Sequence, residues 1–147
     1  MLKETLNQDI KTAMLAGDKV KAEVLKNLKS AILYEEVAQK VRDAGLSDEQ
    51  VQTVLAREAK KRAESAELYQ KAEADERAAS ELHEKEIIEA YLPKQLSDAE
   101  LQKIVDDVFA ANPNAQMGPA IGMVRAKVGS AADGGRIAAM VKAKLQG

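Results

Sequence analysis

The chain has 147 residues, a length that fits one domain or two small ones. It contains no Cys and one His, which excludes disulfides, thiolate metal sites and any site that needs two imidazoles. Hydrophobic residues make up 46% of the chain and aromatic residues 3%, so we expect a globular protein with an aliphatic core.

Charge is distributed unevenly along the chain. Residues 1–92 carry 15 basic and 19 acidic side chains, although the net charge of the whole chain is only −2. From Asn112 onward a single acid, Asp133, opposes five bases: Arg125, Lys127, Arg136, Lys142 and Lys144. Two interpretations stay open. A basic end can mark contact with a polyanion, and helix C-termini also favour Lys and Arg in ordinary proteins.

The sequence lacks the marks of a membrane or secreted protein. No stretch approaches the roughly 18 apolar residues that a spanning helix needs. The first six residues alternate charge with leucine and do not resemble a signal peptide. We therefore expect a cytoplasmic protein with no membrane partner.

The first half of the chain shows helical periodicity throughout. One apolar stripe comprises Leu2, Leu6, Ile10, Ala13 and Met14. Gly17 should end this helix, and Asp18 should cap a second helix that runs to about Arg42. The apolar face predicted for the second helix comprises Val20, Val24, Leu25, Leu28, Ile32 and Val41. Gly45 then terminates the segment.

Two longer helices are predicted next. Residues 47–50 form a capping box, which begins a helix that extends to about Ala72. Its seam includes the polar residues Glu58, Arg62 and Ser65. For these residues we favour an i,i+4 ion pair between Glu58 and Arg62 on an exposed helix over a ligand site. A fourth helix follows from Asp75 to Leu92, with an apolar set of Leu82, Ile87, Ile88, Tyr91 and Leu92.

Pro93 ends this helix, and the segment 93–96 is a candidate hinge. A second capping box at residues 97–100 predicts a helix that ends at 112–114. The next helix has Met117, Ile121, Val124 and Val128 on one side. After a loop at 129–133, Asp133 caps a final helix whose inward residues are Ile137, Met140, Val141 and Leu145.

No segment alternates apolar and polar residues in the manner of a strand. The sequence therefore predicts an all-α fold: an N-terminal bundle of about four helices over residues 1–92, and a small three-helix tail domain over residues 93–147.

The sequence segments that partly match catalytic, cofactor-binding or metal-binding motifs each lack a required residue. His83-Glu84 begins like a zinc-protease helix, but Ile87 stands where the second His is required. The segment 129–136 is rich in Gly, yet it lacks the Lys and Ser/Thr of a phosphate-binding loop. We therefore predict no catalytic residue, no cofactor and no metal site, and expect His83 at the surface.

Three passages resemble the YqeY family over the full length of the chain. The first is Lys61, Arg62, Glu64 and Ser65 followed by Tyr69, and the second is Tyr91, Leu92 and Pro93 followed by Gln95. The third is a C-terminal signature that includes Met117, Gly118, Gly122, Asp133 and Gly134.

The YqeY family is similar to the C-terminal region of GatB, the B subunit of the glutamine-dependent aspartyl/glutamyl-tRNA amidotransferase. That region contacts transfer RNA, and the chemistry takes place elsewhere in the enzyme. The resemblance thus implies a non-catalytic module that contacts tRNA or another structured RNA. Relatives carry a basic run where this chain has the uncharged segment 129–132, so Arg125 and Lys127 would have to compensate.

Three functional hypotheses follow. In the first, a non-catalytic RNA-contact module touches phosphates through Arg125, Lys127, Arg136, Lys142 and Lys144. In the second, the protein is an adaptor that docks to an amidotransferase or synthetase complex through an apolar patch on the tail. The third is participation in carbon–nitrogen ligation with glutamine as amido-N-donor, for which the sequence offers no nucleophile.

Overall fold

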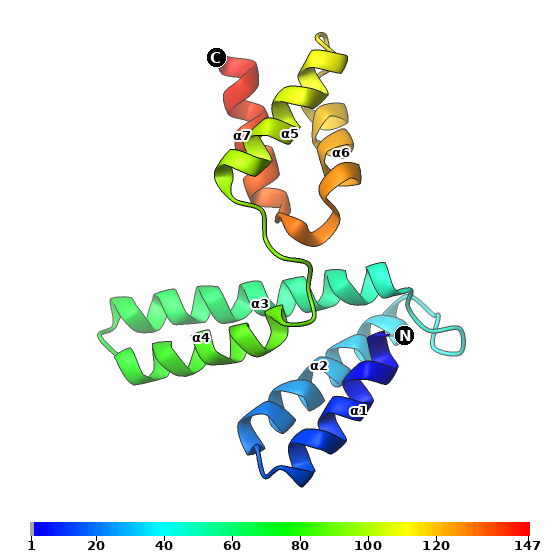
Figure 1. Ribbon diagram of the computed structural model, residues 1–147, viewed down its shortest axis with the longest axis vertical. Coiled ribbons are helices and arrows are strands. Elements are labelled where there is room, and N and C mark those ends of the chain that lie inside the picture. Colours follow the sequence, from blue (N-terminus) through cyan, green and yellow to red (C-terminus); the bar gives the residue numbers. More distant parts are fainter. Residues whose placement is uncertain (1) are drawn as a thin grey trace. The chain divides into compact units, whose positions relative to one another are not determined.

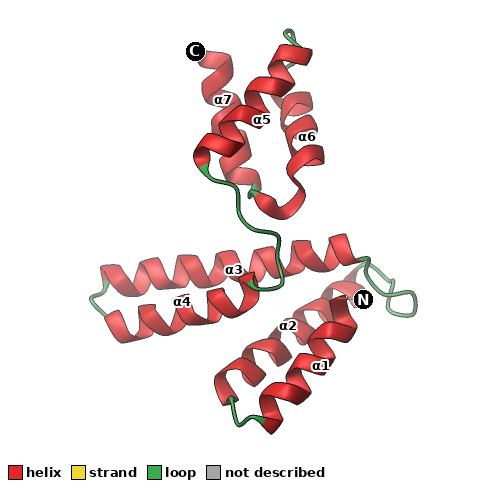
Figure 2. Cartoon of the chain, in the orientation of Figure 1, coloured by secondary structure: helices red, strands yellow, loops and turns green. Residues whose placement is uncertain are grey.

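The computed structural model describes residues 2–147, and these residues form α helices and one short 3-10 helix without any strand (Figures 1 and 2). The elements in chain order are α1 (Leu2–Leu15), α2 (Lys19–Ala38), α3 (Asp48–Lys71), α4 (Asp75–Glu89), α5 (Asp98–Ala111), α6 (Met117–Val128), η1 (Gly129–Ala131) and α7 (Gly134–Gln146). The all-α prediction is confirmed.

The described chain divides into two compact units, residues 1–92 and residues 93–147, each with its own core. In the first unit α1 pairs with α2 and α3 pairs with α4, and α2 contacts both helices of the second pair. Its largest fully buried side chains are Leu6, Leu25, Leu28, Ile32, Leu55 and Ile88. In the second unit α5, α6 and α7 all contact one another around Leu101, Val105, Val124, Ile137 and Val141. As expected, both cores are aliphatic.

Helix α2 ends at Ala38, four residues before the predicted end at Arg42. Lys40 adopts a left-handed conformation (φ 59°), and the Val41 N–H donates to the carbonyl of Glu36 at 2.9 Å. This is a Schellman termination, which usually places Gly at the left-handed position. Residue types alone do not indicate it, because a lysine stands at that position.

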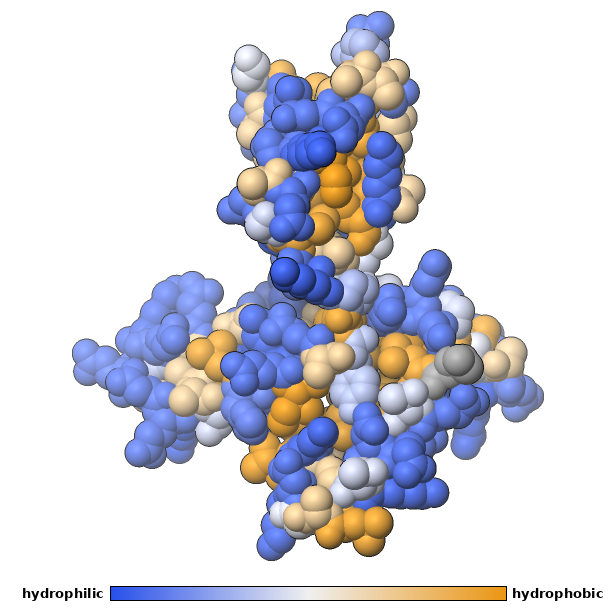
Figure 3. Space-filling model, in the orientation of Figure 1, coloured by the Kyte–Doolittle hydropathy of each residue, from blue (hydrophilic) through white to orange (hydrophobic). Residues whose placement is uncertain are grey.

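Some side chains expected to face the core are exposed. Met14 is 57% exposed, Val20 51% and Leu145 47%, and all three lie close to helix ends. The first two flank the α1–α2 turn, where Leu15 is 91% exposed and hydrophobic surface is visible at the bottom of Figure 3. The periodic pattern fails at these helix ends, where no neighbouring helix covers the side chain, and also at Leu82 in the middle of α4, which is 38% exposed.

A buried carboxylate joins three segments of the first unit. Glu36 on α2 is 2% exposed, and its Oε2 accepts from the Lys3 ammonium of α1 at 2.7 Å and from the Leu46 N–H at 3.0 Å. A Cβ on Gly45 would lie 3.2 Å from that oxygen, and Gly45 has a φ of +77°. The Lys3 hydrogen bond is the main reason why the pKa of Glu36 is held below its ordinary value. The Leu46 N–H adds to this effect, and burial opposes it.

We predict that Glu36→Gln lowers the free energy of unfolding of the first unit by about 1.5–3 kcal/mol at pH 7, because a neutral amide oxygen replaces the charged acceptor of both hydrogen bonds and leaves the Lys3 ammonium without its counter-charge. Urea titration followed by tyrosine fluorescence measures this, since Tyr34, Tyr69 and Tyr91 all lie in residues 1–92. Glu67→Gln is the matched control, because the Glu67 side chain is 67% exposed and, among the described residues, forms an ion pair with Lys71 alone.

The stabilisation from Glu36 should also depend on pH. The folded pKa lies below the ordinary 4.5, so the contribution is complete above that value and is lost as the pH falls through the folded pKa. The difference between the wild type and Glu36→Gln should therefore shrink on acidification. A constant difference down to about pH 3 would contradict this account of the buried carboxylate.

Candidate nucleic-acid interface

The segment that follows Pro93 is attached to the second unit. The Gln95 side-chain amide donates to the carbonyl of Ser130 at 2.9 Å, and the Leu96 N–H donates to the carbonyl of Ala131 at 2.8 Å. Both acceptors lie in or beside η1, between α6 and α7. The signature residue Gln95 thus fastens the start of the second unit to the turn that leads into α7.

Arg136, a predicted phosphate contact, is occupied within the protein. Its guanidinium donates to the Leu96 carbonyl and to Asp98 Oδ1, each at 2.9 Å. Its backbone N–H donates to Asp133 Oδ1, the N-cap of α7. Arg136 therefore ties the beginning of α5 to the beginning of α7, and the side chain is already engaged by the folded chain.

Lys144 likewise faces α5. Its ammonium lies 3.0 Å from Asp106 Oδ1, which also accepts from the Gln102 amide at 2.9 Å. The Gln102 hydrogen bond, followed by Lys144, keeps the pKa of Asp106 below its ordinary value. Both side chains of the Lys144–Asp106 pair are nearly half exposed, so salt and competing anions reach it easily.

Two signature glycines lie on the same side of α6 as Arg125, and a third, Gly134, lies next to its guanidinium. Gly118, Gly122 and Arg125 follow one another at i, i+4 and i+7, which places them on one side of α6. Both glycines are exposed, and a Cβ built on either would meet nothing within 4 Å apart from its chain neighbours and the backbone of its own helix. A Cβ on Gly134, at the start of α7, would lie 2.9 Å from an Arg125 guanidinium nitrogen. The exposed backbone at Gly118 and Gly122, which we call the glycine strip, therefore lies on the same side of α6 as Arg125, and the Arg125 guanidinium lies beside the beginning of α7.

The remaining two candidate cations are exposed, and neither forms an ion pair within 4 Å in the described part of the chain. Lys127 lies two residues beyond Arg125 on α6, so it projects from a different side of that helix. Lys142 lies on α7 away from the side that carries Arg136 and Lys144. The five predicted cations therefore do not converge on one surface.

The signature residues of the first unit have structural partners. The Arg62 guanidinium lies 2.7 Å from Glu58 and 3.9 Å from Glu84 of α4, and each of these side chains is at most 29% exposed. The expected Glu58–Arg62 pair is present, but it is largely buried between α3 and α4 instead of lying on an exposed helix. Lys61 also approaches Glu58, at 3.3 Å, whereas Glu64 is exposed and Ser65 half-buried.

The two signature tyrosines also hold the first unit together. Arg77 of α4 lies 5.9 Å from the centre of the Tyr69 ring, within the range of a cation–π contact. The Tyr91 hydroxyl donates to Asp9 of α1, and burial together with that carboxylate raises the pKa of Tyr91. Leu92 packs against the first core, and Pro93 is exposed.

Among residues 2–147 there is no group of three or more His, Asp or Glu side chains that could hold a metal ion. His83 is exposed, as predicted. Within the same residues, none of the helices is sufficiently long and apolar to cross a membrane.

Comparison with known proteins supplies the family. The family model described as Yqey-like protein matches residues 3–145. The chain belongs to the Yqey-like protein family. A comparison with curated proteins gave no match.

In this family member, sequence reasoning missed Glu36 as an organising residue. A signal was available, because Leu28, Ile32 and Glu36 follow one another at four-residue steps. An acid that continues an apolar stripe must be buried with a partner, since burial of an unpaired charge is very costly. No comparable signal identifies Asp98 and Asp106 as partners of Arg136 and Lys144, because those pairs join distant parts of the sequence.

We predict that Arg136→Ala destabilises the second unit by about 1–2 kcal/mol, because the Leu96 carbonyl loses a charged donor. Hydrogen exchange of the α5 and α7 amides measures this destabilisation. Lys142→Ala is the control and should change exchange by less than about 0.5 kcal/mol. Equal protection in the two variants would show that Arg136 does not hold α5 to α7.

Proposed function

We propose that the second unit is a non-catalytic module that contacts RNA, with transfer RNA as the first candidate. The observation that carries the proposal is the exposed strip of α6 formed by Gly118 and Gly122 beside Arg125. Glycine inside a helix costs about 1 kcal/mol relative to alanine. Nothing packed against α6 requires Gly122, whereas Gly118 precedes Pro119, which disfavours a side chain on the helical residue before it. A bulky ligand that approaches the backbone closely accounts for Gly122.

Charge supports the same choice of ligand. Residues 112–147 carry five bases and one acid, in a chain whose net charge is −2. Arg136 and Lys144 pair internally, whereas Arg125, Lys127 and Lys142 form no ion pair within 4 Å among the described residues. Arg125 is the best placed of these three because it borders the glycine strip, and Lys142 offers a further exposed charge on α7.

Such a surface would position RNA without reading its sequence. Cations that touch phosphates orient a nucleic acid, whereas base recognition needs groove contacts or stacking platforms. Phe109 is the one aromatic residue of the second unit and is partly buried in its core. The similarity to the tRNA-contacting region of GatB gives further support to a role in positioning RNA.

We predict measurable binding of unfractionated tRNA at about 50 mM salt, with affinity that falls as salt is raised. Arg125→Ala combined with Lys142→Ala should weaken binding and reduce the slope of log K against log[salt] by roughly one for each phosphate that the variant no longer neutralises. Fluorescence anisotropy with labelled tRNA measures both quantities.

Lys103→Ala is the matched control for the charge variants, since Lys103 is an exposed lysine of α5 with no ion pair among the described residues. It should leave the affinity and the slope unchanged. Absence of binding at low salt, or an equal effect of the control, would exclude the RNA proposal.

The glycines provide a separate test. Gly122→Ala should stabilise the second unit by about 0.5–1 kcal/mol, because alanine is the better helix former and the added methyl meets no neighbouring element. The variant should bind tRNA more weakly because the methyl group holds the RNA backbone away. Ala110→Gly in α5 is the control: it should reduce stability and leave tRNA affinity intact. A Gly122→Ala variant that gains stability with unchanged affinity would remove the glycine strip from the interface.

A further inference from the structure

The outer face of α2 combines exposed apolar side chains with cations. Leu33 is 44% exposed, Tyr34 78% and Val37 56%. By contrast, the largest exposed hydrophobic residues of the second unit are Met117 and Leu145, at 40% and 47%. The apolar surface that an adaptor needs was expected on the tail, and the structure offers the larger patch on α2 instead.

Lysines extend this patch at both ends. Lys26, Lys29, Leu33 and Val37 follow one another at steps of three, four and four residues, so they form one stripe along α2, and Lys40 lies in the turn just beyond the end of the helix. All five side chains are exposed. We call this set, together with Tyr34, the α2 stripe. It has the width and spacing that a second amphipathic helix requires for packing along its length.

Two of the three acids of α2 are occupied within the chain and do not neutralise these lysines. Glu36 is buried against Lys3, and Glu35 lies 3.7 Å from Arg57 and accepts from the Gln39 amide at 2.7 Å. The third acid, Glu23, is exposed and lies one turn before Lys26. Lys26, Lys29 and Lys40 form no ion pair within 4 Å in the part of the chain that the structure describes. From Val24 to Arg42, α2 and the loop after it therefore present more exposed cations than exposed acids around the apolar centre, although residues 1–92 carry an excess of acids.

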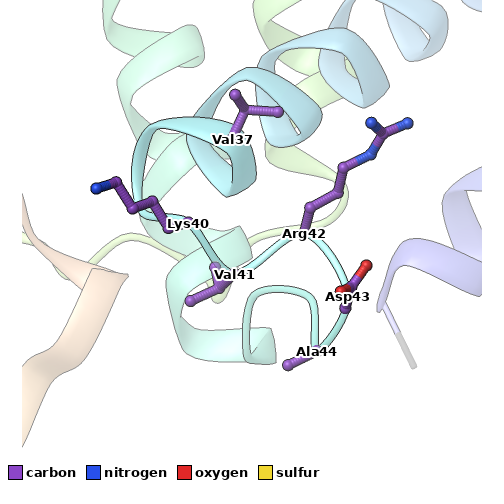
Figure 4. A pocket seen from close by; sticks show the side chains of 6 residues that line it. All are labelled: Val37, Lys40, Val41, Arg42, Asp43 and Ala44. Atoms are coloured by element: carbon purple, nitrogen blue, oxygen red, sulfur yellow. The ribbon is translucent and has the colours of Figure 1, made fainter.

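An open depression of about 440 Å³ lies at the C-terminal end of the stripe (Figure 4). Val37, Val41 and Ala44 contribute apolar atoms to it, and Lys40 and Arg42 extend on different sides of the loop. Asp43 also lines it, so one acid stands beside the two cations. The left-handed residue Lys40 is part of this lining. A depression of this kind can receive one apolar side chain of a docked helix and leave cations free to meet carboxylates.

We propose that the α2 stripe is a docking site for an acidic amphipathic helix of a partner protein. The apolar centre takes the apolar side of that helix, and Lys26, Lys29 and Lys40 pair with acidic side chains at its borders. Leu33 and Val37 at the centre favour a peptide over a nucleic acid, since RNA has no aliphatic group to place against them. Tyr34 is the one ring of the stripe on which a base could stack, and the RNA outcome of the test below accounts for it.

The test starts from a display library of random 14-residue peptides, selected on the full-length chain and counter-selected on the double variant Leu33→Ser/Val37→Ser. Acidic peptides with apolar residues at helical spacing should be enriched. Failure to enrich any peptide, or enrichment of neutral or basic peptides, overturns the proposal.

The most enriched peptide is then synthesised, and its affinity is measured by fluorescence anisotropy. Leu33→Ser/Val37→Ser and Lys26→Glu/Lys29→Glu should each weaken binding at least tenfold, and higher salt should weaken it in the wild type. Leu68→Ser and Lys11→Glu are the controls, because both residues are exposed on other helices. Circular dichroism verifies that every variant is folded. Equally weakened binding in the controls would overturn the assignment to α2.

Two other occupants give distinct results. If a second copy of the chain covers the stripe, sedimentation velocity shows a dimer that Leu33→Ser/Val37→Ser dissociates. If RNA covers it, tRNA affinity falls in Lys26→Glu/Lys29→Glu and is unchanged in Leu33→Ser/Val37→Ser. Either result overturns the peptide proposal, and neither depends on whether Arg125 contacts RNA.

Discussion

The carboxylate of Glu36 is the interaction on which the first unit depends. One oxygen accepts from Lys3 of α1 and from the Leu46 N–H just before α3. The connection between α2 and α3 is irregular, so its backbone groups need partners outside a helix. A charged acceptor makes stronger hydrogen bonds than a neutral one, and the nearby ammonium offsets part of the desolvation cost. Burial of the Glu36 carboxylate, which would be unfavourable without these donors, thereby fixes where α3 begins relative to α1 and α2.

Much of the fold was predictable because local signals agreed with the final packing. The N-caps Asp18, Ser47, Ser97 and Asp133 all accept the expected backbone N–H. Helical periodicity identified most side chains of both cores, and its errors are side chains near helix ends together with Leu82 in the middle of α4. The end of α2 was missed since Lys40 takes a backbone conformation that its side chain disfavours. Only tertiary contacts, including those of Glu36, explain why the chain turns there.

The candidate site was harder to predict than the fold. A count of bases identifies a cationic region, but it does not say which bases the folded chain already uses. Arg136 and Lys144 face acids of α5, and those partners lie nearly 40 residues away in sequence. Arg125 differs because a glycine at the start of α7 makes room for its guanidinium. The distinction between a structural cation and an available one is therefore a property of packing, which sequence spacing does not reveal.

The counter-charge of Glu36 comes from the third residue of the chain. The Lys3 side chain thus links the amino-terminal turn to a connection more than 30 residues away. Loss of the Lys3 ammonium would leave Glu36 in an apolar setting with the Leu46 N–H as its remaining donor among the described residues. The carboxyl would then favour its neutral form, and the α2–α3 connection would open more often. One side chain of α1 would in this way control how often the loop that follows α2 opens.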